Sequence, residues 1–423
     1  MRVQCTGIKH PARSRPTLVA GVAFIALIVA MFVMSPVGAH AQQSRLPFSR
    51  AAAIASALAR GVRLPAAAAD TLVAAAQLLS ARAFTNPTLV TNYTKSVPQY
   101  HAELELPLPF PWIRSARIGS ARFGAAAARL RYSVARASAV LDADTSYTRA
   151  LAAVARTALT ARTAADADTL LRMAMARRDA GDASELDVEL ARVNAGQQAN
   201  AAASDSLTLQ TTLLELQLAI GLAGDSVQAY PTDSLVAPPA GDSLTGETLG
   251  VAAAAATLRA TTLGLAAERR ATWAAPSLLA GFETHDPTGS EPGFLPIIGL
   301  SLPLPLFDRH RGLVATAAAE RQRAIAELAL ARLESHTRIA QLRRERASAL
   351  ARIARGQGVV ASANRVAAMS LTAYREGAAT LPNVLEAQRN ARDILAQYVD
   401  DLARAWIATA TLRALTLTAS PTP

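Results

Sequence analysis

Few side chains of this 423-residue chain could carry out chemistry. Beyond residue 41 it holds four histidines, one lysine (Lys95) and no cysteine. The histidines lack the paired spacings of zinc ligands, and one lysine without neighbouring glycines does not form a phosphate-binding loop. The nucleophile motif GxSxG and the dinucleotide motif GxGxxG are also absent. We therefore expect neither an enzyme nor a bound metal or cofactor.

The first 41 residues predict a secretory signal peptide. A basic segment up to Arg15 precedes an apolar run from Leu18 to Met34, and Ala39-His40-Ala41 supplies small residues for cleavage. An uncleaved anchor is the alternative because the run is long, but the polar residues that follow favour cleavage. The only cysteine, Cys5, precedes the run, so we predict no lipid anchor.

The charge of the chain gives little support to a nucleic-acid partner. Lys and Arg number 43 against 32 acids; the leader contributes four of the cations and no acid, so 39 and 32 remain, a net charge of +7. These cations alternate with acids, as on solvated helix faces. No later stretch reaches about 18 uncharged apolar residues, so a membrane span after the leader would have to consist of β-strands.

An internal duplication organises the rest of the chain. The segment Leu104-Glu105-Leu106-Pro107-Leu108-Pro109 matches Leu300-Ser301-Leu302-Pro303-Leu304-Pro305 at an offset of 196 residues. Gly181 and Gly377 lie in similar segments at the same offset. We therefore predict two homologous halves, 48–245 and 246–420.

Each half begins with an Ala-rich helix and continues with a predicted strand hairpin, at about 88–108 and about 277–304. In the first hairpin His101, Glu103 and Glu105 face one way, and the leucines between and after them face the other. This alternation is typical of outer-membrane strands, with lipid on one face and a wet lumen on the other. A half-buried soluble hairpin shows the same period. The predicted strands are Thr88 to Lys95, His101 to Leu108, Ser277 to Thr284, and Pro296 to Leu304.

Long helices follow each hairpin. From Trp112 to about Arg177 and from Phe307 to about Tyr374 there is no proline. Helices of this length extend on the order of 100 Å, more than a compact domain needs. Each turns at Gly181 or Gly377 and returns, which gives helix pairs at about 112–222 and 307–415. The last helix carries a coiled-coil seam, made of Val384, Ala391, Leu395, Tyr398, Leu402, Ala405 and Leu412.

In this order, these features resemble the TolC-like outer-membrane efflux proteins over nearly the whole mature chain. The most specific features of this resemblance are the segment from Ile298 to Arg309, the duplication and the two helix-turn motifs, Arg178 to Ala191 and Tyr374 to Arg389. The resemblance implies a mostly α protein with a membrane β-barrel part. Three protomers would each give four strands to one 12-stranded outer-membrane barrel, continuous with a periplasmic α-helical barrel.

The resemblance also implies a function and partners. The protein would be a passive exit duct of a tripartite efflux or type I secretion system, located in the outer membrane and reaching into the periplasm. It would act as a homotrimer in outer-membrane lipid, contact a periplasmic adaptor protein and serve an inner-membrane pump indirectly. His101, Glu103 and Glu105 would face the lumen.

The family's helix turns form the periplasmic tip that docks the adaptor. Carried over, the tip residues are Gly181, Ser184, Leu186, Asp187, Gly377, Thr380, Leu381 and Asn383. Glycine suits both turns because it tolerates positive φ, and Ser184 and Thr380 are suitable N-caps. The family narrows its closed pore with acidic side chains; the matching residues here are Asn383 and Glu386, so one carboxylate is missing. Glu386 is a candidate constriction residue, with a solvated helix-face glutamate as the alternative.

A second class of protein also fits long helix pairs. A soluble periplasmic coiled-coil adaptor or scaffold would need no membrane strands. Such adaptors usually carry one helical hairpin between β-domains, whereas this chain has two copies of hairpin plus helix pair. The duplication therefore favours the duct.

Overall fold

The computed structural model describes residues 44–61, 63–108, 110–222, 227–239, 247–271, 275–289, 293–305 and 307–416. The chain divides into two units, Met1–Ser44 and Arg45–Pro423, and the described residues lie almost wholly in the second. The signal peptide predicted for residues 1–41 lies outside the described residues.

One order of elements occurs twice: a helix, two strands, a very long helix and a shorter helix. The first set is α3 (Leu64–Arg82), β2 (Thr88–Tyr93), β3 (Tyr100–Pro107), α4 (Pro111–Asp179) and α5 (Glu185–Ala219). The second is α6 (Leu249–Arg270), β5 (Ser277–Thr284), β6 (Phe294–Ser301), α7 (Arg311–Arg375) and α8 (Leu381–Thr416). The repeat boundaries at 48–245 and 246–420 stay a prediction.

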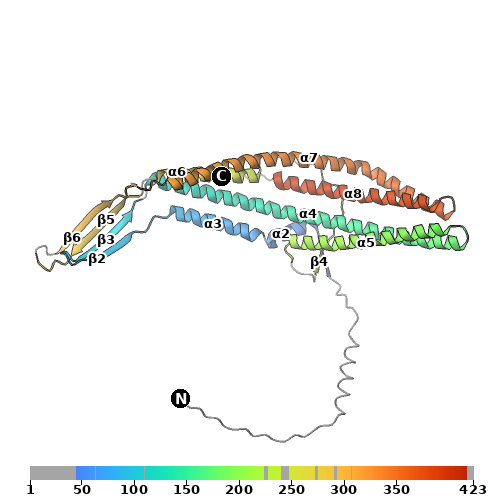
Figure 1. Ribbon diagram of the computed structural model, residues 1–423, viewed down its shortest axis with the longest axis horizontal. Helices are drawn as coiled ribbons and strands as arrows, with labels where there is room; N and C mark the ends of the chain where they lie inside the picture. Colours follow the sequence, from blue (N-terminus) through green and yellow to red (C-terminus); the bar gives the residue numbers. More distant parts are fainter. Residues whose placement is uncertain are drawn as a thin grey trace, which may run out of the picture. The chain divides into compact units, whose positions relative to one another are not determined.

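The four strands form one antiparallel sheet in the order β2-β3-β5-β6, so the two hairpins lie side by side (Figure 1). The last predicted strand is wrong at both ends, since β6 begins at Phe294 and ends at Ser301. Leu302 and Leu304 fall outside it because Pro303 has no N–H for a ladder. Pro296 is accommodated because β6 is an edge strand.

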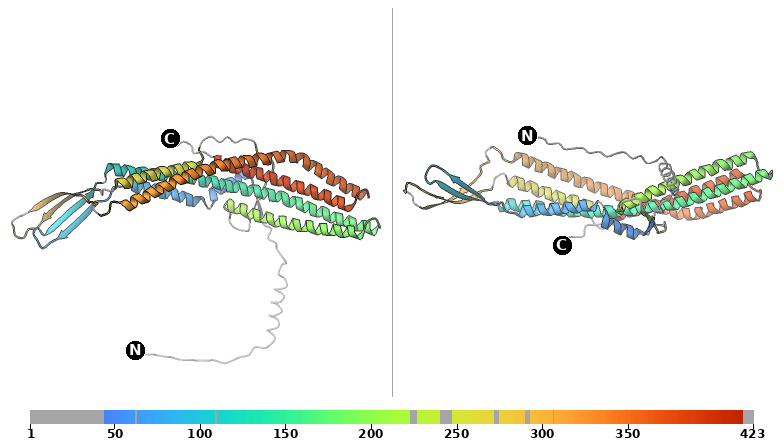
Figure 2. Two further views of the ribbon diagram at one scale, coloured as in Figure 1. Left: turned by 45° about the horizontal axis from the view of Figure 1, so that its top comes forward. Right: turned by 90° about the horizontal axis from the view of Figure 1, so that it is seen from below.

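The helices lie lengthwise against one another. α4 packs along α5, and α7 packs along α8, while α3 and α6 run beside α4 (Figures 1 and 2). α4 has 69 residues and α7 has 65, which corresponds to about 100 Å each. Alanines occupy most buried positions of α4, and small side chains let helix axes approach closely. Of the seam predicted on α8, five residues are buried: Val384, Ala391, Leu402, Ala405 and Leu412.

The start of α7 differs from the prediction, because the helix begins at Arg311 and not at Phe307. His310 has φ 55°, and the His310 backbone N–H donates a hydrogen bond to Asp308 Oδ1 at 2.8 Å. Such an aspartate turn competes with helix formation over the residues that it spans.

Two helices, α3 and α6, are long and apolar enough to cross a membrane by length and composition. Each meets that test with a charged residue inside it, Asp70 in α3 and Arg259 in α6. Helices of soluble cores pass the same test. Ser120 of α4 donates to the Ala260 carbonyl at 2.9 Å, and Ala74 packs on Ala125, so we assign α3 and α6 to the helical part.

The sequence analysis missed a small sheet and a helix beside the long helices. β1 (Ser44–Phe48) pairs with β4 (Val227–Pro231), and α2 (Arg50–Arg60) packs on α4. α2 buries Ala53 and Ala57, and Ser49 caps it by accepting from the Ala52 N–H at 3.2 Å. These elements anchor the N-terminal segment to the middle of α4.

Candidate functional site

The two faces of the four-stranded sheet differ in chemistry. The register places His101 opposite Glu283, with Glu103 and Glu105 on the same face. His101 Nδ1 lies 2.9 Å from Glu283 Oε1, and its Nε2 lies 3.1 Å from Thr94 Oγ1. The three glutamates are the only Asp, Glu, Lys or Arg residues within the four strands. The sequence analysis did not single out Glu283, and strand pairing reveals its place on this face.

The opposite face is apolar and exposed. Leu104, Leu106 and Leu300 lie on it, and Ile298 is the most exposed of the group at 84%. Aromatic residues occur at the loop end of this face, where Tyr93 packs on Tyr100 with ring centroids 5.3 Å apart and Phe282 stacks on Phe294 at 4.1 Å. A second aromatic group, Phe84, Phe110, Trp112 and Phe307, lies where the strands meet the helices. Aromatic girdles beside an apolar band mark the surface of outer-membrane barrels.

The turn between α4 and α5 is built by Gly181 and Ser184. Gly181 has φ 86°, which a side chain would disfavour. Ser184 caps α5: its Oγ accepts from the Asp187 N–H at 3.2 Å, and the Asp187 carboxylate accepts from the Ser184 N–H at 3.1 Å. Asp187 is thus engaged in the cap, while Leu186 is exposed. Hydrogen bonding to Asp179, together with Glu185, raises the pKa of Arg178 beside this turn.

We expect Ser184→Ala to weaken the first turn of α5 by about 1 kcal/mol, because one capping hydrogen bond is lost. Amide hydrogen exchange of residues 185–188 should then accelerate by about fivefold. The matched control is Ser204→Ala, an exposed serine inside α5. Equal exchange in the two variants would contradict the capping role.

The turn between α7 and α8 repeats the glycine geometry, with Gly377 at φ 76°. Thr380 directly precedes α8, and its carbonyl accepts from the Val384 N–H at 3.4 Å. Asn383 is exposed, but Leu381 is only 1% exposed. Leu381 therefore supports the turn from inside and does not offer a surface to a partner.

The two turns lie at the same end of the helices and share one apolar cluster. Arg177 of α4 joins the halves, because its Nη1 donates to the Tyr374 carbonyl at 2.9 Å and its guanidinium lies 4.8 Å from the centre of the Tyr374 ring. Burial raises the pKa of the Tyr374 phenol, and the positive charge of Arg177 opposes this shift. The cluster contains Leu170, Ala174, Val188, Ala191, Tyr374, Leu381 and Val384.

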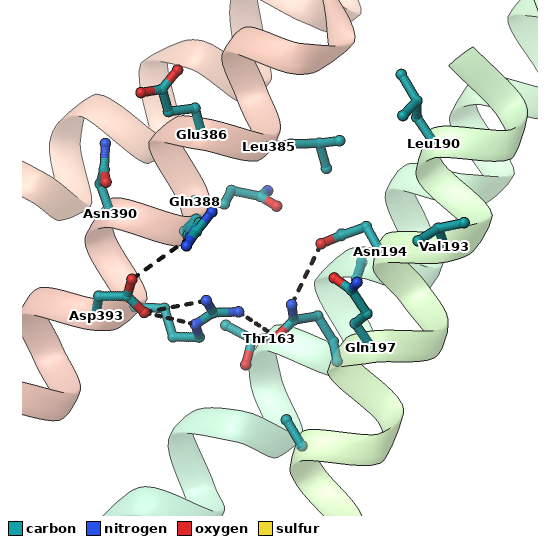
Figure 3. A pocket seen from close by; sticks show the side chains of 15 residues that line it. Thr163, Leu190, Val193, Asn194, Gln197, Leu385, Glu386, Gln388, Asn390 and Asp393 are labelled. Atoms are coloured by element: carbon teal, nitrogen blue, oxygen red, sulfur yellow. Dashed lines mark hydrogen bonds and ion pairs between the residues drawn. The ribbon is translucent and has the colours of Figure 1, made fainter. Parts of the chain in front are cut away.

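A polar groove of about 1040 Å³ lies between α4 and α5 on one side and α8 on the other (Figure 3). Glu386, which is exposed, lines its α8 wall, and Asn194 and Gln197 line its α5 wall. Arg392 bridges the groove, because its Nη1 donates to Gln198 Oε1 at 2.7 Å. Asn383 does not line the groove. Amides and charges of both signs thus face one space between the two helix pairs.

A second group of buried polar residues lies midway along α4 and was missed by the sequence analysis. The Arg50 guanidinium pairs with Asp144, donates to Thr148 Oγ1 at 2.9 Å and lies 4.0 Å from the centre of the Trp406 ring. Tyr147 donates to the Phe48 carbonyl and to Asp233, each at 2.9 Å. Burial is the main cause of the raised pKa of Tyr147. No sequence motif predicts this group, which we call the buried junction, because its residues come from four separate segments of the chain.

Comparison with known proteins places this geometry in a known fold. No protein-family profile matches the chain, and no curated protein matches it. Solved structures do match. The outer membrane protein VceC from Vibrio cholerae is 18% identical, with a TM-score of 0.71 over 87% of this chain and 96% of that chain.

Two further channels give the same result. The CmeC outer membrane channel from Campylobacter jejuni is 16% identical, with a TM-score of 0.73 over 87% of this chain and 85% of that chain. CusC, solved in a study of transmembrane channel formation, is 19% identical, with a TM-score of 0.72 over 86% of this chain and 91% of that chain. The chain therefore has the fold of these outer-membrane channel proteins.

Proposed function

We propose that the protein is a passive outer-membrane exit duct of a tripartite efflux or type I secretion system. The observation that carries this proposal is the sheet with one exposed apolar face, aromatic residues at both its ends, and all its glutamates and its histidine on the other face. The sheet leads directly into helices of about 100 Å. A wet lumen that continues from barrel to helices would let cargo cross the outer membrane and the periplasm.

The open edges of the sheet support assembly from several copies. Among the described strands, β2 and β6 each have one neighbour. Unpaired backbone groups are costly in lipid, so a membrane sheet must close on itself. Three copies of a four-stranded sheet give twelve strands, an even number that falls within the range of bacterial barrels.

The helix turns at the far end are the proposed docking site for a periplasmic adaptor. Leu186 and Asn383 are exposed there, and the groove of Figure 3 opens between the helix pairs beside them. Leu381 would not contact the adaptor, because its side chain is buried. The inner-membrane pump would act through the adaptor and supply the energy.

Electron microscopy of the tagged protein, extracted from a separated outer-membrane fraction, tests the proposal. We expect a threefold hollow particle on the order of 130 Å long, since about 100 Å of helix joins about 30 Å of barrel. A protein found in the soluble periplasmic fraction would support the scaffold alternative. The fold match along most of the chain favours the duct over that alternative.

Glu386 gives a prediction for the open channel. Glu386 is exposed and lines the groove near the turns, so Glu386→Ala should lower the cation preference of the reconstituted channel, by roughly twofold at low salt. Reversal potentials across a planar bilayer measure this preference. The control is Glu345→Ala, which removes an exposed carboxylate from the middle of α7. Unchanged selectivity in Glu386→Ala would leave this residue as a solvated glutamate.

A further inference from the structure

Arginines gather where the strands meet the helices. They lie in the last turn of α3, the first two turns of α4, the last turn of α6 and the segment 307–311 that leads into α7. These segments hold two acidic residues, Glu268 and Asp308. We name the group the arginine belt, and its members are Arg82, Arg114, Arg117, Arg269, Arg270, Arg309 and Arg311.

Hydrogen bonds hold one part of the belt together. Arg114 donates to the Arg82 carbonyl at 2.8 Å, and Arg117 donates to the carbonyls of Ala81 and Ala83. These two guanidinium groups cap the C-terminus of α3, where positive charge is favoured. Arg270 donates to the Trp112 carbonyl at 2.9 Å, which ties the end of α6 to the start of α4.

The rest of the belt is exposed. The side chains of Arg82, Arg309 and Arg311 are accessible, and none forms an ion pair with a described residue. Aromatic side chains accompany them: Phe84 lies under the Arg114 guanidinium at 4.3 Å, and Phe307 is fully exposed. Aromatic rings beside arginines are the composition found at a membrane–water interface.

The other end of the sheet lacks such charges. Between residues 84 and 114 Lys95 is the only Lys or Arg, and between 270 and 309 there is none. The arginines at the sheet are therefore confined to its helix end, and Lys95 is the one cation at the loop end. A need for general solubility would not produce this asymmetry.

We propose that the arginine belt binds anionic phospholipid headgroups in the periplasmic leaflet of the membrane that the sheet crosses. This inference rests on the proposed function, because it places the sheet in a bilayer. The apolar face would hold the acyl chains, the aromatic residues would lie at the boundary, and the guanidinium groups would contact the phosphates. The belt thus sets the depth of the sheet in the membrane and prefers phosphatidylglycerol over a zwitterionic lipid.

The test compares full-length protein with two triple variants in detergent, titrated with phosphatidylglycerol or phosphatidylcholine and read by native mass spectrometry. Arg82→Gln/Arg309→Gln/Arg311→Gln removes three exposed belt charges whose side chains form no ion pair with a described residue. Arg162→Gln/Arg343→Gln/Arg344→Gln removes three exposed charges far from the belt, one in the last third of α4 and two in the middle of α7. We expect the unmodified protein and the second variant to prefer phosphatidylglycerol. The belt variant should lose about fivefold in affinity for each arginine removed.

Equal binding of the two lipids by the unmodified protein would overturn the inference, as would equal losses in the two variants. Channel conductance of the same preparations separates this result from the proposed function. If the protein conducts ions but shows no lipid preference, lipid binding by the arginine belt is contradicted and the proposed duct function stands. If the protein forms no channels, the proposed duct function is contradicted. Inorganic phosphate, added at the lipid concentration, should not displace phosphatidylglycerol, since the aromatic and acyl contacts are absent for the free ion.

Discussion

Ile298→Arg should abolish accumulation of the protein in the outer membrane. Ile298 is 84% exposed and lies on the apolar face of the edge strand β6, opposite Ala280. An arginine in the lipid-facing part of a membrane strand costs about 2–4 kcal/mol near the bilayer centre, and a trimer would carry three. We expect more than a tenfold loss of protein from the outer-membrane fraction, measured by immunoblot after separation of the membranes.

The neighbouring residue supplies a matched control. Ile297 has the same side chain, points to the other face and pairs with Gly281. An arginine there would lie diagonal to Glu283 and on the same face as Glu103, so it gains carboxylate partners in a wet lumen. Ile297→Arg should therefore accumulate nearly as the unmodified protein does. If the protein were a soluble scaffold, we would expect the reverse result. Ile297→Arg would then lower accumulation, because Ile297 is half-buried, and Ile298→Arg would be tolerated.

The sheet shows which kinds of signal a sequence carries well. Strand β5 was predicted with the observed ends, because Pro276 precedes it and a glycine- and proline-rich loop follows. The alternation of His101, Glu103 and Glu105 placed them on one face without knowledge of the pairing. Glu283 joined them only through the β3–β5 pairing, which brings together residues 182 positions apart. The local alternation of a strand does not predict which residues of a distant strand will pair with it.

At the two helix turns, too, the sequence predicted the local features but not those that depend on packing between the halves. Glycine and serine predicted the turn and the cap of α5, because these residues act on their own backbone. The burial of Leu381 and the contact of Arg177 with Tyr374 depend on the packing of the first half against the second. A motif carried over from a family assigns a position along the chain, but it does not decide whether the side chain faces a partner or the interior.

The buried junction around Arg50 was invisible in the sequence for a further reason. Arg50 follows β1, Asp144 and Tyr147 lie inside a 69-residue helix, and Trp406 belongs to the last helix. Each residue alone fits a solvated or apolar helix position. Only the fold brings a cation, a carboxylate and two aromatic rings into contact.

Arg50→Ala should therefore be among the most destabilising single substitutions in the helical part. Asp144 is 6% exposed, and the Arg50 guanidinium neutralises its carboxylate. Removing one partner of a buried ion pair leaves an uncompensated charge and costs about 3–5 kcal/mol. Loss of the ring contacts with Tyr147 and Trp406 adds to this. The measurement is thermal unfolding in detergent, followed by circular dichroism at a wavelength that reports helix, where we expect a decrease of several degrees.

An exposed ion pair close by, between Arg63 at the start of α3 and Asp142 of α4, provides the control. Arg63 Nη1 lies 3.0 Å from Asp142 Oδ2, but the two side chains are 80% and 43% exposed, so Arg63→Ala should change the free energy of unfolding by less than about 1 kcal/mol. Adding Asp144→Asn to Arg50→Ala should restore part of the loss, because it removes the unpaired charge. Equal effects of Arg50→Ala and Arg63→Ala, or no rescue by Asp144→Asn, would show that the junction is not held by this buried pair. Rescue would show that one electrostatic contact links α2, α4 and α8, midway between the four-stranded sheet and the two helix turns.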